Sequence, residues 1–223
     1  MKRALAVLLC FVLLTGLFSA CRKSTVSALY FSVPGTASGF DPQIAAGEAV
    51  RIVVRNCFEG LVYLDDTGTP IPAAAERWTV SPDGLEYTFT LRQGAKWHVT
   101  DTVRSGLEGK LPADFAPEVT AADFVFALQR AVDPVTGAPD AALLSNISGA
   151  EAILAGEAAP SSLGVRAEGK YKLSITLAHP EPGFLETLAE PLCMPCNKTF
   201  FEATGGRYGL LMKYILSNGP FYL

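Results

Sequence analysis

Two stretches of the chain alternate strictly between apolar and polar side chains. In residues 85–91 (LEYTFTL) every second position is apolar, and the turn sequence SPDG comes just before it at 81–84. This period of two predicts a half-buried strand that a tight turn joins to a partner strand at 78–80. A shorter alternation at 173–177 predicts a further strand.

Other segments follow the period of a helix. Asp123 stands three positions after Thr120, as in a capping box, and Phe124, Leu128 and Ala131 then share one face until an Asp-Pro pair ends the pattern. The same reasoning predicts helices at 46–56, 150–155, 184–188 and 198–203, and a long surface loop at 99–118, where Gly, Pro and mixed charge prevail. Helices and strands in this mixture indicate an α+β fold.

Several residues within these patterns are expected to be structural. Phe89, Trp97 and Phe124 stand at strand or helix spacing and are expected in the core. Glu76 and Arg92 are candidates for an ion pair across the hairpin, which at a surface contributes little stability. None of the five is assigned a role in function.

Composition and charge then exclude several classes of protein. The 223 residues are 49% hydrophobic, and 18 Lys and Arg stand against 22 Asp and Glu. So much apolar surface with well-mixed charge is unlike a disordered chain. A sequence pI of about 5.2 lacks the basic character that nucleic-acid-binding proteins share. We expect a folded, mildly acidic protein with no nucleic-acid partner.

The N-terminus has the pattern of an export signal. Lys2 and Arg3 precede an apolar run, and the small residues Ser19 and Ala20 come just before Cys21. The apolar run is shorter than the roughly 20 residues of a membrane span. Its end resembles a bacterial lipobox, which predicts that residues 1–20 are a lipoprotein signal peptide and that Cys21 carries a lipid; the alternative is an ordinary signal peptide cut after Ala20. In either case the protein is exported, lipid-anchored at the outer face of the cytoplasmic membrane or located in the periplasm.

The remaining cysteines and histidines offer little chemistry. Cys193 and Cys196 have the spacing of a redox motif, so an exported thiol-disulfide oxidoreductase is one alternative, and a structural disulfide or two buried thiols is the other. A thioredoxin-like motif opens a helix after a strand, whereas this pair follows Glu190 and a proline. His98 and His179 lie far apart, and neither has a second ligand at helical spacing, so no metal site is expected.

Motifs for catalysis are also lacking from the sequence. It has no Gly-x-Ser-x-Gly elbow, and Arg104 stands where a phosphate-binding loop before Gly109 and Lys110 needs its first glycine. An exported chain without such chemistry indicates a binding module, not an enzyme, and no cofactor is expected.

Eight blocks of sequence occur in an order typical of one family. They are FDP at 40–42, FEGL at 58–61, PAAAERW at 72–78, SPDGLEYTFTLR at 81–92, KW at 96–97, VTAADFV at 119–125, RAVDP at 130–134 and NGPF at 218–221. Together they resemble the N-terminal part of the family 5 extracellular solute-binding proteins, the oligopeptide-, dipeptide- and nickel-binding components of ABC importers.

The resemblance implies a periplasmic-binding-protein-like fold (type II, cluster C) with two lobes that close on a ligand. It implies that residues 21–58 begin the ligand-binding lobe I, that 59–196 form an inserted α+β subdomain, and that 197–223 return to lobe I. The second lobe would be missing, so the chain is expected to be a fragment of a protein about twice as long. The expected partners are a peptide or another small solute and the permease and ATPase subunits of an importer. The protein is expected to act as a monomer.

The resemblance also implies where a ligand lies. Peptide-binding relatives hold the peptide as an added strand, which here would run along Ala46, Gly47 and Glu48; the alternative is that Gly47 merely bends the start of a helix. Those relatives have an acid at the position of Ala46 and an aromatic residue at that of Asp140, so Glu48 would have to supply the charge. Nickel or haem capture, with His98 and His179 as candidates, is the other alternative within the family. The loop at 99–118 is longer than in relatives and is expected at the subdomain rim, where it need not touch the ligand.

Overall fold

The computed structural model describes residues 28, 30, 32, 33, 35 and 39–223. The chain divides into two units, Met1–Ser32 and Val33–Leu223, and the second contains every helix and strand described below. The expected signal peptide at 1–20 and the lipidation candidate Cys21 lie outside the described residues. In the part of the chain that is described, no helix is long and apolar enough to cross a membrane.

Helices and strands alternate along the second unit. The helices are α2 (Glu48–Cys57), α3 (Asp101–Gly106), α4 (Ala121–Val132), α5 (Ala150–Leu154), α6 (Phe184–Thr187) and α7 (Lys198–Thr204). The 3₁₀ turns are η1 (Pro42–Ile44), η2 (Ala141–Leu144), η3 (Pro160–Ser162), η4 (Pro191–Cys193) and η5 (Met212–Tyr214). The strands are β1 (Val62–Leu64), β2 (Pro70–Pro72), β3 (Ala75–Val80), β4 (Glu86–Leu91), β5 (Val165–Ala167) and β6 (Lys172–Thr176). The mixed α+β fold expected from the sequence is confirmed.

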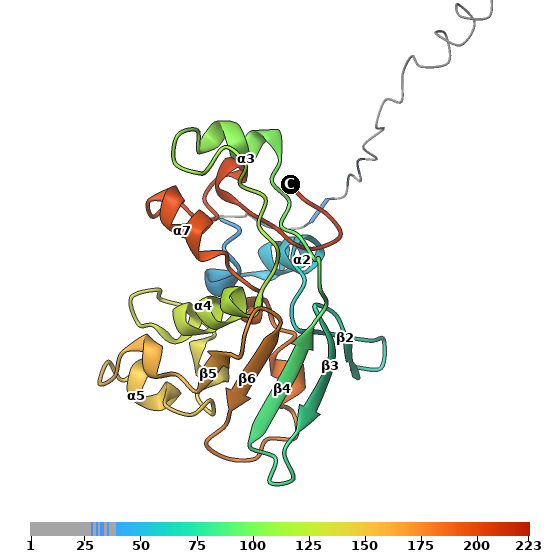
Figure 1. The fold of residues 1–223 in the computed structure, drawn as a ribbon, viewed down its shortest axis with the longest axis vertical. Coiled ribbons are helices and arrows are strands. Elements are labelled where there is room, and N and C mark those ends of the chain that lie inside the picture. Colours follow the sequence, from blue (N-terminus) through green and yellow to red (C-terminus); the bar gives the residue numbers. More distant parts are fainter. Residues whose placement is uncertain (1–27, 29, 31, 34, 36–38) are drawn as a thin grey trace, which may run out of the picture. The chain divides into compact units, whose positions relative to one another are not determined.

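A four-stranded antiparallel sheet has the order β3-β4-β6-β5 (Figure 1). The expected hairpin is its first pair, with Trp78 opposite Phe89 and Val80 opposite Tyr87. Along β4, Tyr87, Phe89 and Leu91 are buried while the residues between them are partly exposed, which is the alternation read from the sequence. A separate two-stranded ribbon, β1 with β2, precedes this sheet.

Helix α4 covers part of the sheet and begins as the sequence predicts. Thr120 and Asp123 form the capping box, in which the Thr120 N–H donates to the Asp123 carboxylate at 2.7 Å. The helix contacts β5 and β6. Phe89 and Phe124 are fully buried and Trp97 nearly so, which confirms the expected core.

The expected ion pair between Glu76 and Arg92 is wrong. Arg92 instead bonds the Glu59 carboxylate at 2.6 Å, and Glu76 pairs with its neighbour Arg77. The ladder between β3 and β4 shifts register between Ala75 and Arg77, so Glu76 lies in the irregularity and has no residue directly opposite it.

The expected loop at 99–118 contains a helix. Thr100 caps α3, accepting a hydrogen bond from the Val103 N–H, and Val103 and Leu107 are buried. An isolated antiparallel β-bridge between Lys96 and Glu118 joins the two ends of the segment through their backbones. Helix α3 packs against η5, which lies near the C-terminal end of the chain. The placement of this segment at the subdomain rim stays a prediction.

Candidate functional site

The segment that leads into α2 is exposed and sharply turned. Ala46, Gly47 and Glu48 are exposed, whereas Ala45 before them and Ala49 after them are buried. Gly47 has φ of 81°, a left-handed value that favours glycine, and a Cβ there would meet no atom within 4 Å. The bend given as the alternative interpretation is therefore present, and it leaves the three candidate residues open to a ligand.

The same segment presents unused hydrogen-bonding groups. Among the described residues, neither the N–H nor the C=O of Ala46 has a partner, and the Gly47 N–H has none either. Within the part of the chain that is described, no side chain caps α2 and its first N–H groups also have no partner, as at any uncapped helix start. The Glu48 carboxylate lies in this first turn and has no ion-pair partner in the part of the chain that is described. The site thus combines free backbone donors and an acceptor with one carboxylate.

Asp140, the remote candidate, lies beside α2. Its carboxylate forms an ion pair with Arg51, one helical turn after Glu48. Arg51 also reaches Glu190 at 3.5 Å, and Arg55 reaches the same Glu190 carboxylate at 3.1 Å. Because Asp140 already has a cationic partner, its charge is balanced within the protein. Sequence reasoning missed Arg51, although its position three residues after Glu48 puts it on a neighbouring part of the helix surface.

A buried ion pair fixes the residues just before the candidate segment. Arg130 on α4 donates from Nη2 to the Asp41 Oδ2 at 2.7 Å, and Asp41 also accepts from the Gln43 N–H at 3.1 Å. The Gln43 side chain donates to the Met194 carbonyl at 2.8 Å. Burial alone would lower the pKa of Arg130, but the hydrogen bond and charge of Asp41 raise it above its ordinary value. Phe201 lies under the Arg130 guanidinium, 4.1 Å from the ring centroid.

A small pocket opens next to Ala46. Its volume is about 40 Å³, and it is lined by Gly39, Asp41, Ile44, Ala46, Tyr208, Gly209 and Leu210. Burial raises the Tyr208 pKa well above its ordinary value, so the hydroxyl stays neutral. No local pattern in the sequence connects these two segments, which lie more than 160 positions apart.

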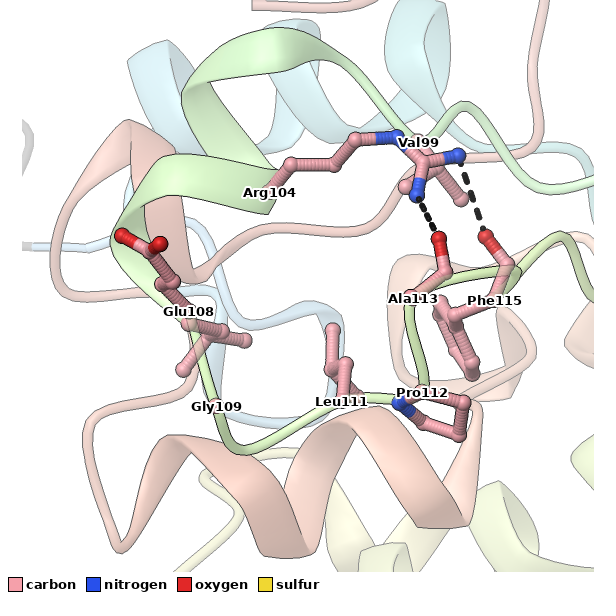
Figure 2. Close-up of a pocket in the computed structure, with 9 residues that line it drawn as sticks. Val99, Arg104, Glu108, Gly109, Leu111, Pro112, Ala113 and Phe115 are labelled. Carbon is pink, nitrogen blue, oxygen red and sulfur yellow. Dashed lines mark hydrogen bonds between the residues drawn. The ribbon is translucent and has the colours of Figure 1, made fainter.

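A larger pocket, of about 310 Å³, lies within the segment that carries α3 (Figure 2). One continuous stretch, from Val99 to Phe115, forms all of its wall. Arg104 crosses this stretch and donates to the carbonyls of Ala113 and Phe115, each at 3.2 Å, while the Glu108 carboxylate points away (Figure 2). The Arg104 guanidinium therefore links two parts of the same segment. None of the binding-site candidates from the sequence lines this pocket.

The histidines do not form a metal site. The His98 Nε2 is within hydrogen-bond distance, 2.6 Å, of the Gly219 carbonyl oxygen. His179 lines an open hollow with Glu151 and Glu181. Among the described residues, no group of three or more His, Cys, Asp or Glu side chains could hold a metal ion.

The cysteines are buried free thiols. Cys57, Cys193 and Cys196, the three that the structure describes, form no disulfide. Burial raises the pKa of Cys57 to about 11 and that of Cys196 to about 12, and it raises that of Cys193 further with help from Glu190. Redox-active thiols have depressed pKa values, so this environment is opposite to that of a catalytic pair.

Comparisons with known proteins agree on one family. Residues 69–223 match the family model described as "Bacterial extracellular solute-binding proteins, family 5 Middle". The chain is 34% identical over 204 residues to a dipeptide-binding protein of Lactococcus lactis, covering 91% of this chain and 34% of that protein. It is 40% identical over 166 residues to a protein of Escherichia coli named a probable deoxycholate-binding periplasmic protein, covering 74% and 28%. The structure of a peptide-bound oligopeptide-binding protein of Listeria monocytogenes superposes with a TM-score of 0.74 at 32% identity, covering 84% of this chain and 34% of that one. The chain thus has the fold of these binding proteins and spans about a third of the length of the relatives it matches.

Proposed function

We propose, on the premise that this chain belongs to the bacterial extracellular solute-binding proteins of family 5, that it is part of a protein that captures peptides for an ABC importer. The observation that carries the proposal is the exposed stretch of Ala46, Gly47 and Glu48. The N–H and C=O of Ala46 and the N–H of Gly47 have no partners among the described residues, and the Glu48 carboxylate stands at the end of the stretch.

The chemistry of this stretch suits a peptide main chain. An extended peptide laid along Ala46 can accept from its N–H and donate to its C=O, as an added strand does at a sheet edge. Such contacts are common to all peptides, so they give affinity without selecting a sequence. Gly47 has no side chain to obstruct the approach of another backbone.

Charge favours a ligand with a cationic group. Glu48 has no ion-pair partner in the described part of the chain, whereas Asp140 and Glu190 both have arginine partners. A peptide carries an ammonium group that could pair with Glu48. A bile acid such as deoxycholate is an anion and would be repelled by the same carboxylate.

The proposal includes the route to the membrane. We place the protein outside the cytoplasm, with residues 1–20 removed as a signal peptide and a lipid on Cys21. It acts there as a monomer without catalysis, delivering ligand to the permease and ATPase subunits of its importer. Residues 21–58 and 197–223 belong to lobe I in this proposal, and 59–196 form the inserted subdomain.

The test is calorimetry of the purified protein with four separate ligands. A mixture of di- to pentapeptides should give a binding heat, whereas Ni²⁺, haem and sodium deoxycholate should not. Replacing Glu48 by Gln should weaken peptide binding by up to about fivefold, the size of an exposed charge pair. Glu108→Gln is the matched control, because Glu108 is also exposed and lies in the α3 segment. No heat with peptides, or heat with deoxycholate, haem or Ni²⁺ alone, would overturn the proposal.

A further inference from the structure

We infer that the pocket beside Ala46 is a subsite for one short aliphatic side chain of the bound peptide, of alanine to valine size. This inference rests on the proposed function and adds a specificity to it. The pocket lies between residues 39–46 and the segment formed by Tyr208, Gly209 and Leu210.

Close approach of two backbones creates the pocket. The Phe40 N–H donates to the Gly209 carbonyl at 2.8 Å, and the Gly209 N–H donates to the Tyr214 carbonyl at 2.9 Å. Gly209 has φ of 77°, and a Cβ there would lie 2.3 Å from the Asp41 nitrogen. Only glycine allows this approach, so the main chain itself fixes part of the wall.

The position of the pocket connects it to the ligand. Ala46 lines the pocket and also carries the free N–H and C=O groups of the candidate site. A peptide held by those groups therefore has one of its residues next to the pocket opening. Successive side chains of an extended peptide point to opposite sides, so one can enter while its neighbours point elsewhere.

The lining selects an uncharged, apolar group. Ile44 and Leu210 are 40% and 53% exposed, so a ligand side chain between them would cover apolar surface. Asp41 is the one charged residue of the lining, and its carboxylate is already bound to Arg130 and to the Gln43 N–H. A cationic side chain would thus find no unpaired carboxylate in the lining.

Size sets the upper limit. The pocket volume is about 40 Å³, and about 10–15 Å³ of such volume holds one water molecule, so a few water molecules fill the pocket. A methyl or isopropyl group is of that order, whereas a phenyl ring is larger. Ring side chains would have to push Ile44 and Leu210 apart or remain outside.

The experiment measures affinity for tripeptides in which one residue is Gly, Ala, Val, Leu or Phe, at each position in turn. At one position, Ala or Val should bind at least about tenfold more tightly than Phe, the difference that pocket size commonly gives. Leu210→Ala should move the optimum to Leu or Phe, and Ala46→Val should move it to Gly. Leu211→Ala is the matched control, because Leu211 is equally exposed at 55% but does not line the pocket.

Failure of the subsite and failure of peptide capture give different results in this experiment. Peptide binding with no size preference at any position, or the same shift with Leu211→Ala as with Leu210→Ala, would overturn the subsite while leaving peptide capture intact. Absence of binding to every peptide would overturn the proposed function and the subsite together. Circular dichroism of each variant shows whether it is folded, and the unaltered protein tests the preference without any substitution.

Discussion

Arg130 and Asp41 lie 89 positions apart in the sequence and form a buried ion pair, with an Nη2 to Oδ2 distance of 2.7 Å and side chains only 10% and 6% exposed. The pair connects α4, which packs on the sheet, to the residue that caps η1 just before the candidate ligand segment. The orientation of Ala46, Gly47 and Glu48 therefore depends on a contact made far from them along the chain.

Removing one member of this pair should strongly destabilise the protein. Arg130→Met leaves the Asp41 carboxylate buried without its cation, which should lower the free energy of unfolding by about 3–5 kcal/mol. Urea unfolding followed by circular dichroism measures this. The control is Arg166→Met, since Arg166 pairs with Glu86 at the surface and should cost at most about 1 kcal/mol. Equal effects of the two substitutions would contradict this account.

The thiols should be inert in the folded protein. Burial raises the pKa of Cys196 to about 12 and that of Cys57 to about 11, so at pH 8 almost no thiolate forms. With Cys10 and Cys21 replaced by Ser, Ellman's reagent should react slowly with the native protein and with three thiols after denaturation in guanidinium. Rapid reaction of the native protein, together with reduction of insulin disulfides, would instead support the redox alternative.

Acid should weaken the fold partly through Glu168. The hydrogen bonds from Lys172 and Ser174, and then from Arg166, lower the Glu168 pKa from 4.5 to about 2. A carboxyl group with a lowered folded-state pKa stabilises the protein above its unfolded pKa, and this contribution is lost as the pH falls from about 4.5 through 2.

Glu168→Gln should accordingly reduce stability at pH 7 and flatten the decline between pH 4.5 and 2. Thermal melting across this pH range measures both effects. Glu157→Gln, at an exposed position with no ion pair among the described residues, should leave the slope unchanged. The account of Glu168 would be wrong if both variants lost stability in parallel with the unaltered protein.

The contact between α3 and η5 should be sensitive to one added methyl group. A Cβ at Gly106 would lie 2.6 Å from the Lys213 Cβ, too close for either chain to remain in place. Gly106→Ala should cost about 1–3 kcal/mol by overpacking. Gly183→Ala is the matched control, because a Cβ there meets nothing within 4 Å and its φ is −88°. Chemical denaturation compares the two, and an equal or smaller loss for Gly106→Ala would contradict this packing.

Local patterns predicted the local structure well. The capped helix from Thr120 and the strand at Glu86–Leu91 are confirmed because their periods, caps and turn lie within a few residues of one another. Helix α3 was not predicted, because the glycines and prolines of its segment favour a loop and the helix signal there is short. That signal was Thr100 as a cap, with Val103 and Leu107 four positions apart.

Long-range contacts could not be predicted in this way. Nothing near Asp41 in the sequence indicates Arg130, and nothing near Ala46 indicates Leu210. The register shift at Glu76, because of which Glu76 does not pair with Arg92, is a property of the β3–β4 pairing and not of either strand alone. The candidate segment itself was named from a family resemblance, whereas its pocket became visible only in three dimensions.

A peptide that lies along Ala46 and Gly47 should protect their amide hydrogens from exchange with solvent, which NMR measures for each residue. Both N–H groups lack partners among the described residues, so they should exchange fast in the free protein. Saturation with a bound peptide should slow the exchange of one or both, while Gly94, in a turn after β4, should not change. Unchanged exchange at Ala46 and Gly47 in the presence of a peptide that binds would show that the peptide does not lie along this segment.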